Sequence, residues 1–356
     1  MTRIGAAVVG AGMFGKIHAR TYAESDKCDL LYVSDRDYSA ACNLAELYGA
    51  TPTTSVTDIA ADDNVHAVSI ATPDAEHYEP GIALITAGKH VICEKPLATR
   101  LDEARRLYHA TRKKGSILMV DFHNRFNPPC LELKRRLQTL GRPIHGSICL
   151  NNRIDVPLAK LPWAAQTGPE WFLLPHVVDL ARWYAGAEPQ AVTAMRLDGL
   201  LKSRGLDVPD AVLALLEFDG CSITVESSWV LPQSWPAMIE FEGKIVCENG
   251  RGSFRAHDHG LSVHSAGGDR LPFVYGDYDA FGERTGFFRL PVLHFIDSIA
   301  HGVLPAIYGR DGLMVTMIVE AIMTSAAQKR RVLIGEFMQP SDAELGLIEE
   351  EEEIAP

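Results

Sequence analysis

The sequence predicts an α/β fold in which an N-terminal, doubly wound parallel sheet is followed by an α+β domain with a mostly antiparallel open sheet. Up to about Asp121, short apolar runs alternate with helix-like segments, a pattern typical of βαβ units. After Pro128 and Pro129 the pattern changes to one more helix and then to strand-like runs of period two. With 356 residues, the chain is long enough for two domains that each bury a core.

The first half supplies the parallel sheet and its helices. Its predicted strands are the apolar runs 6–10, 30–35, 66–73, 90–96 and 117–122. Its predicted helices begin at Phe14 and then cover 39–49, 78–88 and 101–114. The last helix is well marked, because Asp102 and Glu103 lie in its first turn and Gly115 follows its end.

The second half supplies the second sheet. Its predicted strands are 147–154, 191–197, 211–218, 222–230 and 237–243, and two helices near 287–301 and 311–328 close it. We therefore divide the chain into a parallel-sheet domain (1–123), an α+β domain (124–340) and an acidic tail (341–356). The tail contains a run of glutamates at 349–353 and is expected to be solvated and disordered.

The composition argues against several classes of partner. A net charge of −12 disfavours nucleic acid and anionic membranes, because either would need a basic face. The seven cysteines form no C-x-x-C pair and lie mostly in apolar runs, so we expect a reducing compartment and no metal site. A strand pattern begins within three residues of Met1, and the longest apolar stretch, 313–323, contains Glu320. We expect a cytoplasmic protein with a small-molecule ligand and no signal peptide or membrane span.

A glycine-rich turn, GAGMFG, follows the first predicted strand and opens the first helix. Gly10 permits a tight turn, Gly12 lets the backbone approach a pyrophosphate, and Gly15 allows the helix to pack closely on the strand. Met13 and Phe14 complete the helix N-terminus, whose amide groups favour an anion. The turn therefore predicts a Rossmann-type site for a dinucleotide cofactor.

The end of the second predicted strand indicates which cofactor is bound. Asp35 lies 20 residues beyond Gly15, where its carboxylate can accept hydrogen bonds from the adenosine ribose and repel a 2′-phosphate. NAD is therefore favoured over NADP. The next residue, Arg36, leaves two alternatives open: its guanidinium can pair with a 2′-phosphate or stack on adenine, or it is simply solvated.

Charged residues end the buried-looking strand HVIC, which runs directly into Glu94, Lys95 and Pro96. A lysine at the carboxyl edge of a parallel sheet lies beside a bound dinucleotide and can exchange a proton with a substrate hydroxyl. The alternative is a surface lysine that happens to precede a proline.

These motifs together resemble the Gfo/Idh/MocA oxidoreductases, the group of glucose-fructose oxidoreductase and inositol dehydrogenases. The resemblance covers nearly the whole chain. It rests on VVGAGMFG, SIATPDAEHY, HVICEKPLA, HNRFNP, HVVDLARW, HFIDSIAHG and the segment 311–332, in this order. It implies that Lys95 is the active-site lysine, and that Glu94 and Pro96 shape a turn, often with a cis Lys–Pro bond, that presents it to the nicotinamide.

The resemblance also assigns residues of the first domain to the cofactor and substrate. Thr72 and Pro73 would lie under the nicotinamide ribose, and His77 would contact the cofactor. Asn124 and Arg125 would lie at the lip of the cleft, where Arg125 can reach the substrate or brace the lysine. A salt-bridged structural role for this arginine is the alternative.

One segment departs from the pattern of the polyol dehydrogenases in this family, G-G-x-x-x-D-x-x-x-H. In TGPEWFLLPHVVDLARW, His176 matches the histidine, but Phe172 occupies the aspartate position. We expect Lys95 and His176 to share the proton transfer, with Phe172 as an apolar wall that changes the substrate. Alternatively, a neighbouring acid such as Glu170 takes over, or turnover is lost. Pro175 predicts a bent or late-starting helix.

Further substrate-binding candidates lie on the second sheet and the loop after its first strand: Asn152, Arg153, Trp163 and Trp229. Aromatic rings can stack on the apolar face of a sugar while amide and guanidinium groups bind its hydroxyls. Trp229 can instead belong to the core or to a subunit interface. The resemblance implies a homodimer or homotetramer in which open sheets pack face to face.

The leading interpretation is an NAD(P)-dependent dehydrogenase that oxidises a secondary alcohol of a sugar, inositol or related cyclic polyol. Phe172 motivates an alternative, a less polar substrate such as a dihydrodiol or an aryl glycoside. A third interpretation is a non-catalytic protein that senses NAD on the same fold.

Overall fold

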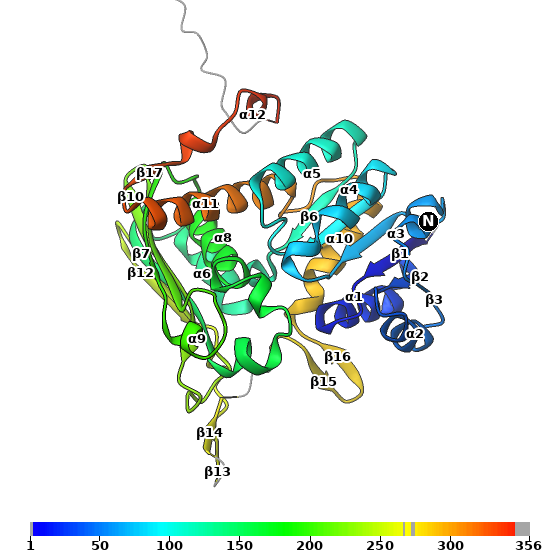
Figure 1. The fold of residues 1–356 in the computed structure, drawn as a ribbon, viewed down its shortest axis with the longest axis horizontal. Coiled ribbons are helices and arrows are strands. Elements are labelled where there is room, and N and C mark those ends of the chain that lie inside the picture. Colours follow the sequence, from blue (N-terminus) through cyan, green and yellow to red (C-terminus); the bar gives the residue numbers. More distant parts are fainter. Residues whose placement is uncertain (1–2, 266–267, 272–274, 346–356) are drawn as a thin grey trace, which may run out of the picture.

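Two β-sheets with helices packed against them make up the fold (Figure 1). The computed structural model describes residues 3–265, 268–271 and 275–345. The first sheet is parallel, with six strands in the order β3-β2-β1-β4-β5-β6. Its elements are β1 (Ile4–Val9), α1 (Met13–Glu24), β2 (Cys28–Ser34), α2 (Tyr38–Glu46), β3 (Thr51–Thr53), α3 (Val56–Ala61), β4 (Ala67–Ile70), α4 (Tyr78–Thr86), β5 (His90–Glu94), α5 (Leu101–Lys114) and β6 (Leu118–Asp121). The strand order reverses between β1 and β4, which is where α/β sheets bind ligands.

The second sheet has seven strands in the order β12-β11-β7-β10-β9-β8-β17. Its neighbours are antiparallel except β7 and β10, which run parallel. The elements of this half are α6 (Pro128–Leu137), β7 (Pro143–Arg153), α7 (Pro169–Phe172), α8 (Leu174–Ala185), β8 (Ala191–Leu197), α9 (Leu200–Ser203), β9 (Ala211–Phe218), β10 (Cys221–Leu231), β11 (Ile239–Cys247), β12 (Gly250–Arg255), α10 (Leu290–His301), α11 (Gly309–Gln328), β17 (Val332–Leu333) and α12 (Ser341–Glu344). Short strands of three residues each also form two hairpins, β13 (Val263–Ser265) with β14 (Gly268–Arg270) and β15 (Tyr278–Ala280) with β16 (Glu283–Thr285).

The predicted fold class is confirmed, and the strands predicted at 191–197 and 211–218 coincide with β8 and β9. The helix break expected near Pro175 is also present: α7 ends at Phe172, and α8 begins at Leu174 with a proline in its first turn. Among the helices that the structure describes, none is both long and apolar enough to cross a bilayer.

The start of the acidic tail differs from the prediction. Residues 341–345 are ordered into α12 and the turn after it, because Asp342 is fully buried and binds Arg105 of α5, with 2.9 Å between its Oδ1 and Nε. Pairing of a carboxylate with a guanidinium in a buried site holds this segment against the first domain. The glutamates at 349–353 lie outside the described residues.

Helix α11 begins against the parallel sheet, where it lies along α5, and runs toward β8 and β17 of the second sheet (Figure 1). Two glycines in its first turn allow the close approach. A Cβ added at Gly309 would lie 2.8 Å from Tyr108, and one at Gly312 would lie 2.5 Å from Val120. Helix α11 therefore covers β6, the last strand of the first sheet, although it belongs to the second half of the sequence. The domain boundary at residue 123 stays a prediction.

Three charged groups lie buried beneath the carboxyl edge of the parallel sheet: His18 of α1, Glu94 at the end of β5 and Asp121 at the end of β6. The Nε2 atom of His18 is 3.3 Å from Asp121 Oδ2 and 3.6 Å from Glu94 Oε1. Burial alone would lower the pKa of His18, but Asp121 and Glu94 raise it to about 9. Burial and the charge of Glu94 raise the pKa of Asp121 to about 7.

We expect Gly312→Ala to destabilise the protein by about 2 kcal/mol, because the added methyl group would overlap Val120 and Leu97 in a packed interface. Urea unfolding measures the effect. The matched control is Gly335→Ala, since among the described residues no atom beyond the neighbouring backbone lies within 4 Å of the added Cβ there. Equal stability of the two variants would contradict the close packing of α11.

His18 should make the stability of the protein depend on pH. Its folded pKa of about 9 lies above the ordinary 6.5, so its contribution is complete below pH 6.5 and is lost as the pH rises through 9. From the size of this shift, the loss is about 3 kcal/mol. Unfolding free energies of the wild type at several pH values should decline between pH 6.5 and pH 9. A stability that stays constant over this range would contradict the assignment.

Candidate active site

The glycine turn between β1 and α1 leaves open space where a cofactor would approach. Gly10 has a φ of +101°, and a Cβ at Gly15 would lie 1.8 Å from the Gly10 carbonyl oxygen, so neither position tolerates a side chain. Around Gly12, in contrast, no atom of the described chain would lie within 4 Å of an added Cβ. The turn is held from below by Asp35, whose Oδ2 accepts a hydrogen bond from the Ala11 amide at 2.8 Å.

This turn fits a dinucleotide. No side chain of the described residues caps the N-terminus of α1, so its first amide groups can donate to a pyrophosphate. Met13 is exposed beside the turn, whereas the Phe14 ring stacks on His123 at 5.5 Å between centroids. Arg36 reaches across to Glu76, with 2.9 Å between Nη1 and Oε1.

Lys95 follows β5 and is almost completely buried. The Lys95–Pro96 bond is cis. The Lys95 Nζ donates a hydrogen bond to the Phe172 carbonyl oxygen at 3.1 Å, lies 4.5 Å from the centre of the Phe172 ring and is 3.9 Å from Asp74 Oδ1. The side chain of Glu94 turns back beneath the turn, where its Oε2 accepts from the Lys95 amide at 3.3 Å.

His77 connects the turn after β4 with the turn that carries Lys95. Its ring is fully buried, with Nδ1 2.6 Å from the Pro96 carbonyl oxygen and Nε2 2.9 Å from that of Thr72. The Thr72 hydroxyl donates to the Glu76 carbonyl oxygen at 3.1 Å. His77 thus braces the backbone at Thr72, Pro73 and Pro96, and a direct contact with the cofactor stays a prediction for these residues.

His176, near the start of α8, is buried beside the turn after β6. Its Nδ1 is 3.2 Å from Asn124 Nδ2, and its ring centre is 4.8 Å from that of His123. Burial, followed by the neighbouring charges of His123 and Lys95, lowers the pKa of His176 well below 6.5. Its imidazole is therefore neutral at pH 7 and can accept or donate a hydrogen bond.

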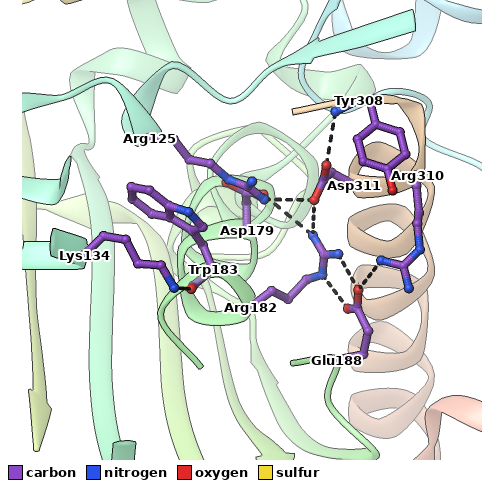
Figure 2. Close-up of polar contacts among 9 residues, drawn as sticks. All are labelled: Arg125, Lys134, Asp179, Arg182, Trp183, Glu188, Tyr308, Arg310 and Asp311. Atoms are coloured by element: carbon purple, nitrogen blue, oxygen red, sulfur yellow. Dashed lines mark hydrogen bonds and ion pairs between the residues drawn. The ribbon is translucent and has the colours of Figure 1, made fainter. Parts of the chain in front are cut away.

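A charge network fixes this turn to the second domain (Figure 2). Arg125 donates to Asp179 of α8, with 2.8 Å between Nε and Oδ2, and to Asp311 of α11 at 3.0 Å. Arg182 continues the network to Glu188 at 2.6 Å. The guanidinium of Arg125 is therefore engaged in salt bridges, one helical turn away from His176, and a contact of Arg125 with substrate stays a prediction.

Aromatic residues of the second domain cover the lysine. The Phe172 and Trp229 rings lie 5.7 Å apart, and Trp229 is fully buried behind Phe172. Asn152 is buried at the end of β7 and Trp163 packs against the core, but Arg153 binds Asp155 through two contacts of 2.9 Å. Phe172 therefore contacts Lys95 directly, with Trp229 packed against its ring, while the guanidinium of Arg153 is paired with Asp155.

The structure adds three residues to this site that the sequence prediction missed: Asp74, His123 and Thr167. Asp74 directly follows Thr72 and Pro73, and His123 lies two residues after β6, so their positions near strand ends were the available signals. Thr167 lies in the loop before α7, and its sequence carries no such signal.

Comparison with known proteins places the chain in a family. Residues 4–122 match the model of an oxidoreductase family with an NAD-binding Rossmann fold, and residues 131–252 match the GFO/IDH/MocA C-terminal domain. The chain is 26% identical over 337 residues to an inositol 2-dehydrogenase of Rhizobium meliloti (strain 1021), covering 92% of this chain and 98% of the relative.

Two further relatives extend this comparison. The chain is 36% identical over 253 residues to a D-glucoside 3-dehydrogenase of Escherichia coli (strain K12), covering 63% of this chain and 70% of the relative. A crystal structure of GenD2 from gentamicin A biosynthesis, in complex with NAD, superposes with a TM-score of 0.82 at 26% identity, covering 94% of this chain and 97% of that one. The glycine turn, the buried lysine and these matches together show that the chain belongs to the Gfo/Idh/MocA family of NAD-binding oxidoreductases.

Proposed function

We propose that this protein is an NAD-dependent dehydrogenase that acts on a secondary alcohol carbon of a sugar, an inositol or a related cyclic polyol. The observation that carries the proposal is the position of Lys95. Lys95 follows β5 at the carboxyl edge of the parallel sheet, and β5 is the neighbour of β4, where the strand order reverses. Its Nζ contacts the second domain by donating to the Phe172 carbonyl oxygen. Dehydrogenation of an alcohol needs a group at this place that can take up the hydroxyl proton.

The side chains of this site can bind and orient an alcohol. Bound NAD would supply the acceptor for the hydride. In oxidation, Lys95 Nζ would exchange the Phe172 carbonyl oxygen for the substrate hydroxyl and, as the neutral amine, take up its proton to become the ammonium, and in reduction the ammonium would return the proton. The neutral imidazole of His176 can bind the same hydroxyl or the one beside it, because Asn124 and His123 hold its ring in place.

The preference for NAD rests on the end of β2. Asp35 lies next to the glycine turn with its carboxylate directed at the backbone of Ala11 and Asp37. A 2′-phosphate at this position would meet that negative charge. Arg36, which could offset the repulsion, is paired with Glu76.

Phe172 and Trp229 support a second candidate substrate class. The Phe172 ring lies against Lys95 Nζ and is backed by Trp229, and such an aromatic wall favours a ligand with an apolar face, such as an alkyl or aryl glycoside, over a freely soluble polyol. The similarity to a D-glucoside 3-dehydrogenase points in the same direction.

The test is NADH formation when purified protein meets NAD, or NADP, and a panel of inositols, aldoses, sugar acids and aryl glycosides. We expect turnover with NAD, and Lys95→Met should lower kcat/KM by about 10²- to 10⁴-fold because proton transfer is lost. Lys202→Met, which changes an exposed lysine, is the matched control. Tight NAD binding without turnover on any compound would contradict the proposal and favour a sensor of NAD.

We also propose that two copies of the chain associate through the open face of the second sheet. Helices α6, α8 and α11 pack on one face of this sheet. The other face is hollowed and carries exposed Met195, Leu213 and Leu215 together with charges of both signs, among them Glu242 and Lys244. A face with apolar residues and both charges can be complementary to itself about a two-fold axis.

Sedimentation velocity at micromolar concentration should show a dimer or a larger oligomer. Met195→Glu should shift the protein toward the monomer, because two added charges would meet across the two-fold axis. Leu47→Glu introduces the same charge at an exposed leucine of the first domain and should leave the oligomer intact. A monomeric wild type would contradict this arrangement.

A further inference from the structure

Asp74 lies against the catalytic lysine and is itself almost completely buried. Its Oδ1 is 3.9 Å from Lys95 Nζ. Among the residues that the structure describes, no other carboxylate oxygen comes within 4.0 Å of this nitrogen. The other partners of Nζ, the Phe172 carbonyl oxygen and ring, carry no net charge. Asp74 is therefore the nearest carboxylate to the buried Lys95 side chain among the described residues.

The second oxygen of Asp74 is fixed by the other domain. The hydroxyl of Thr167 donates to Asp74 Oδ2 at 2.5 Å, and both side chains are buried. Thr167 precedes Gly168, whose φ of +114° directs the chain into α7 and toward Phe172. One short segment of the second domain thus supplies both the group that holds Asp74 and the carbonyl that binds Lys95.

We propose that Asp74 is the positioning residue of Lys95, held in its orientation by Thr167. The inference rests on the proposed function, in which Lys95 takes up the substrate proton. Phe172 of the second domain offers no carboxylate to this lysine, so the carboxylate comes from Asp74 of the first domain. A lysine side chain has four rotatable bonds, so a fixed charge partner restricts where its ammonium can lie. When Nζ leaves the Phe172 carbonyl for a substrate hydroxyl, Asp74 keeps it in the cleft.

The contact also links alignment of the lysine to the approach of the two domains. Asp74 has its full set of contacts only when the segment that contains Thr167 lies over the first domain. If that segment moves away, Asp74 loses its hydrogen bond and Lys95 loses the Phe172 carbonyl together.

The first test uses the full-length protein without substrate. Trace labelling with acetic anhydride, read by mass spectrometry, reports how readily each lysine reacts as a free amine. Loss of its charged partner frees the Lys95 nitrogen from its fixed, buried position and makes it more accessible to the reagent. We therefore expect Asp74→Asn to raise the labelling rate of Lys95 about tenfold relative to Lys202, an exposed lysine in the same molecule. Asp74→Glu should stay within about threefold of the wild type.

Thr167→Val provides a variant that keeps the charge and removes only the hydrogen bond. It should raise the Lys95 labelling rate by less than Asp74→Asn does. If Asp74→Asn fails to fold, Thr167→Val alone must still exceed the wild type. Unchanged labelling of Lys95 in whichever of these variants fold would overturn the proposal.

The second test uses any panel compound that the wild type oxidises. Asp74→Asn should lower kcat by about tenfold to a hundredfold with a smaller change in the KM for NAD, and Asp74→Glu should restore part of the loss. A purely structural aspartate would instead change cofactor binding and stability. A wild type without turnover, combined with faster labelling of Lys95 in Asp74→Asn, would refute the proposed function and leave the pairing of Asp74 with Lys95 standing.

Discussion

Pairing of buried charges along the seam between the two domains is the constraint on which the site depends. A buried charge without a partner of opposite charge destabilises the fold by several kcal/mol, so each buried charge must be paired when the two domains pack together. Arg125 does so with Asp179 and Asp311, and Lys95 does so with Asp74. His18 is compensated within the first domain by Glu94 and Asp121. The geometry that holds the proposed catalytic groups is thus the same geometry that keeps these charges from being isolated.

The parts of the site that could be predicted from the sequence are those decided within a short stretch of chain. Gly10 and Gly15 are required by contacts with backbone a few residues away or on the next strand, and Asp35 follows from the end of β2. The position of Lys95 at the edge of the sheet also follows from β5, the strand that precedes it. Such local rules are sufficient for the glycine turn and for the residues at the ends of strands.

Long-range contacts set the rest, and no local rule gives them. Asp74 and Thr167 are 93 residues apart, and Arg125 and Asp311 are 186 apart. Whether Arg125 faces substrate or a carboxylate depends on where α8 and α11 pack, which the sequence left open. The tail prediction was wrong at Asp342 for the same reason, since its partner Arg105 is 237 residues away and the segment looked merely polar.

Helix α11 has a consequence for how this protein is made. It covers β6 of the first sheet, yet it lies at residues 309–328, after six of the seven strands of the second sheet. During synthesis, the parallel sheet therefore emerges from the ribosome long before the helix that covers its last strand. Until then, the apolar side chains of Leu97 and Val120 that α11 packs against lack their partner. The first domain should become fully stable only after α11 has also emerged, so that the order of domains along the sequence is not the order in which they are finished.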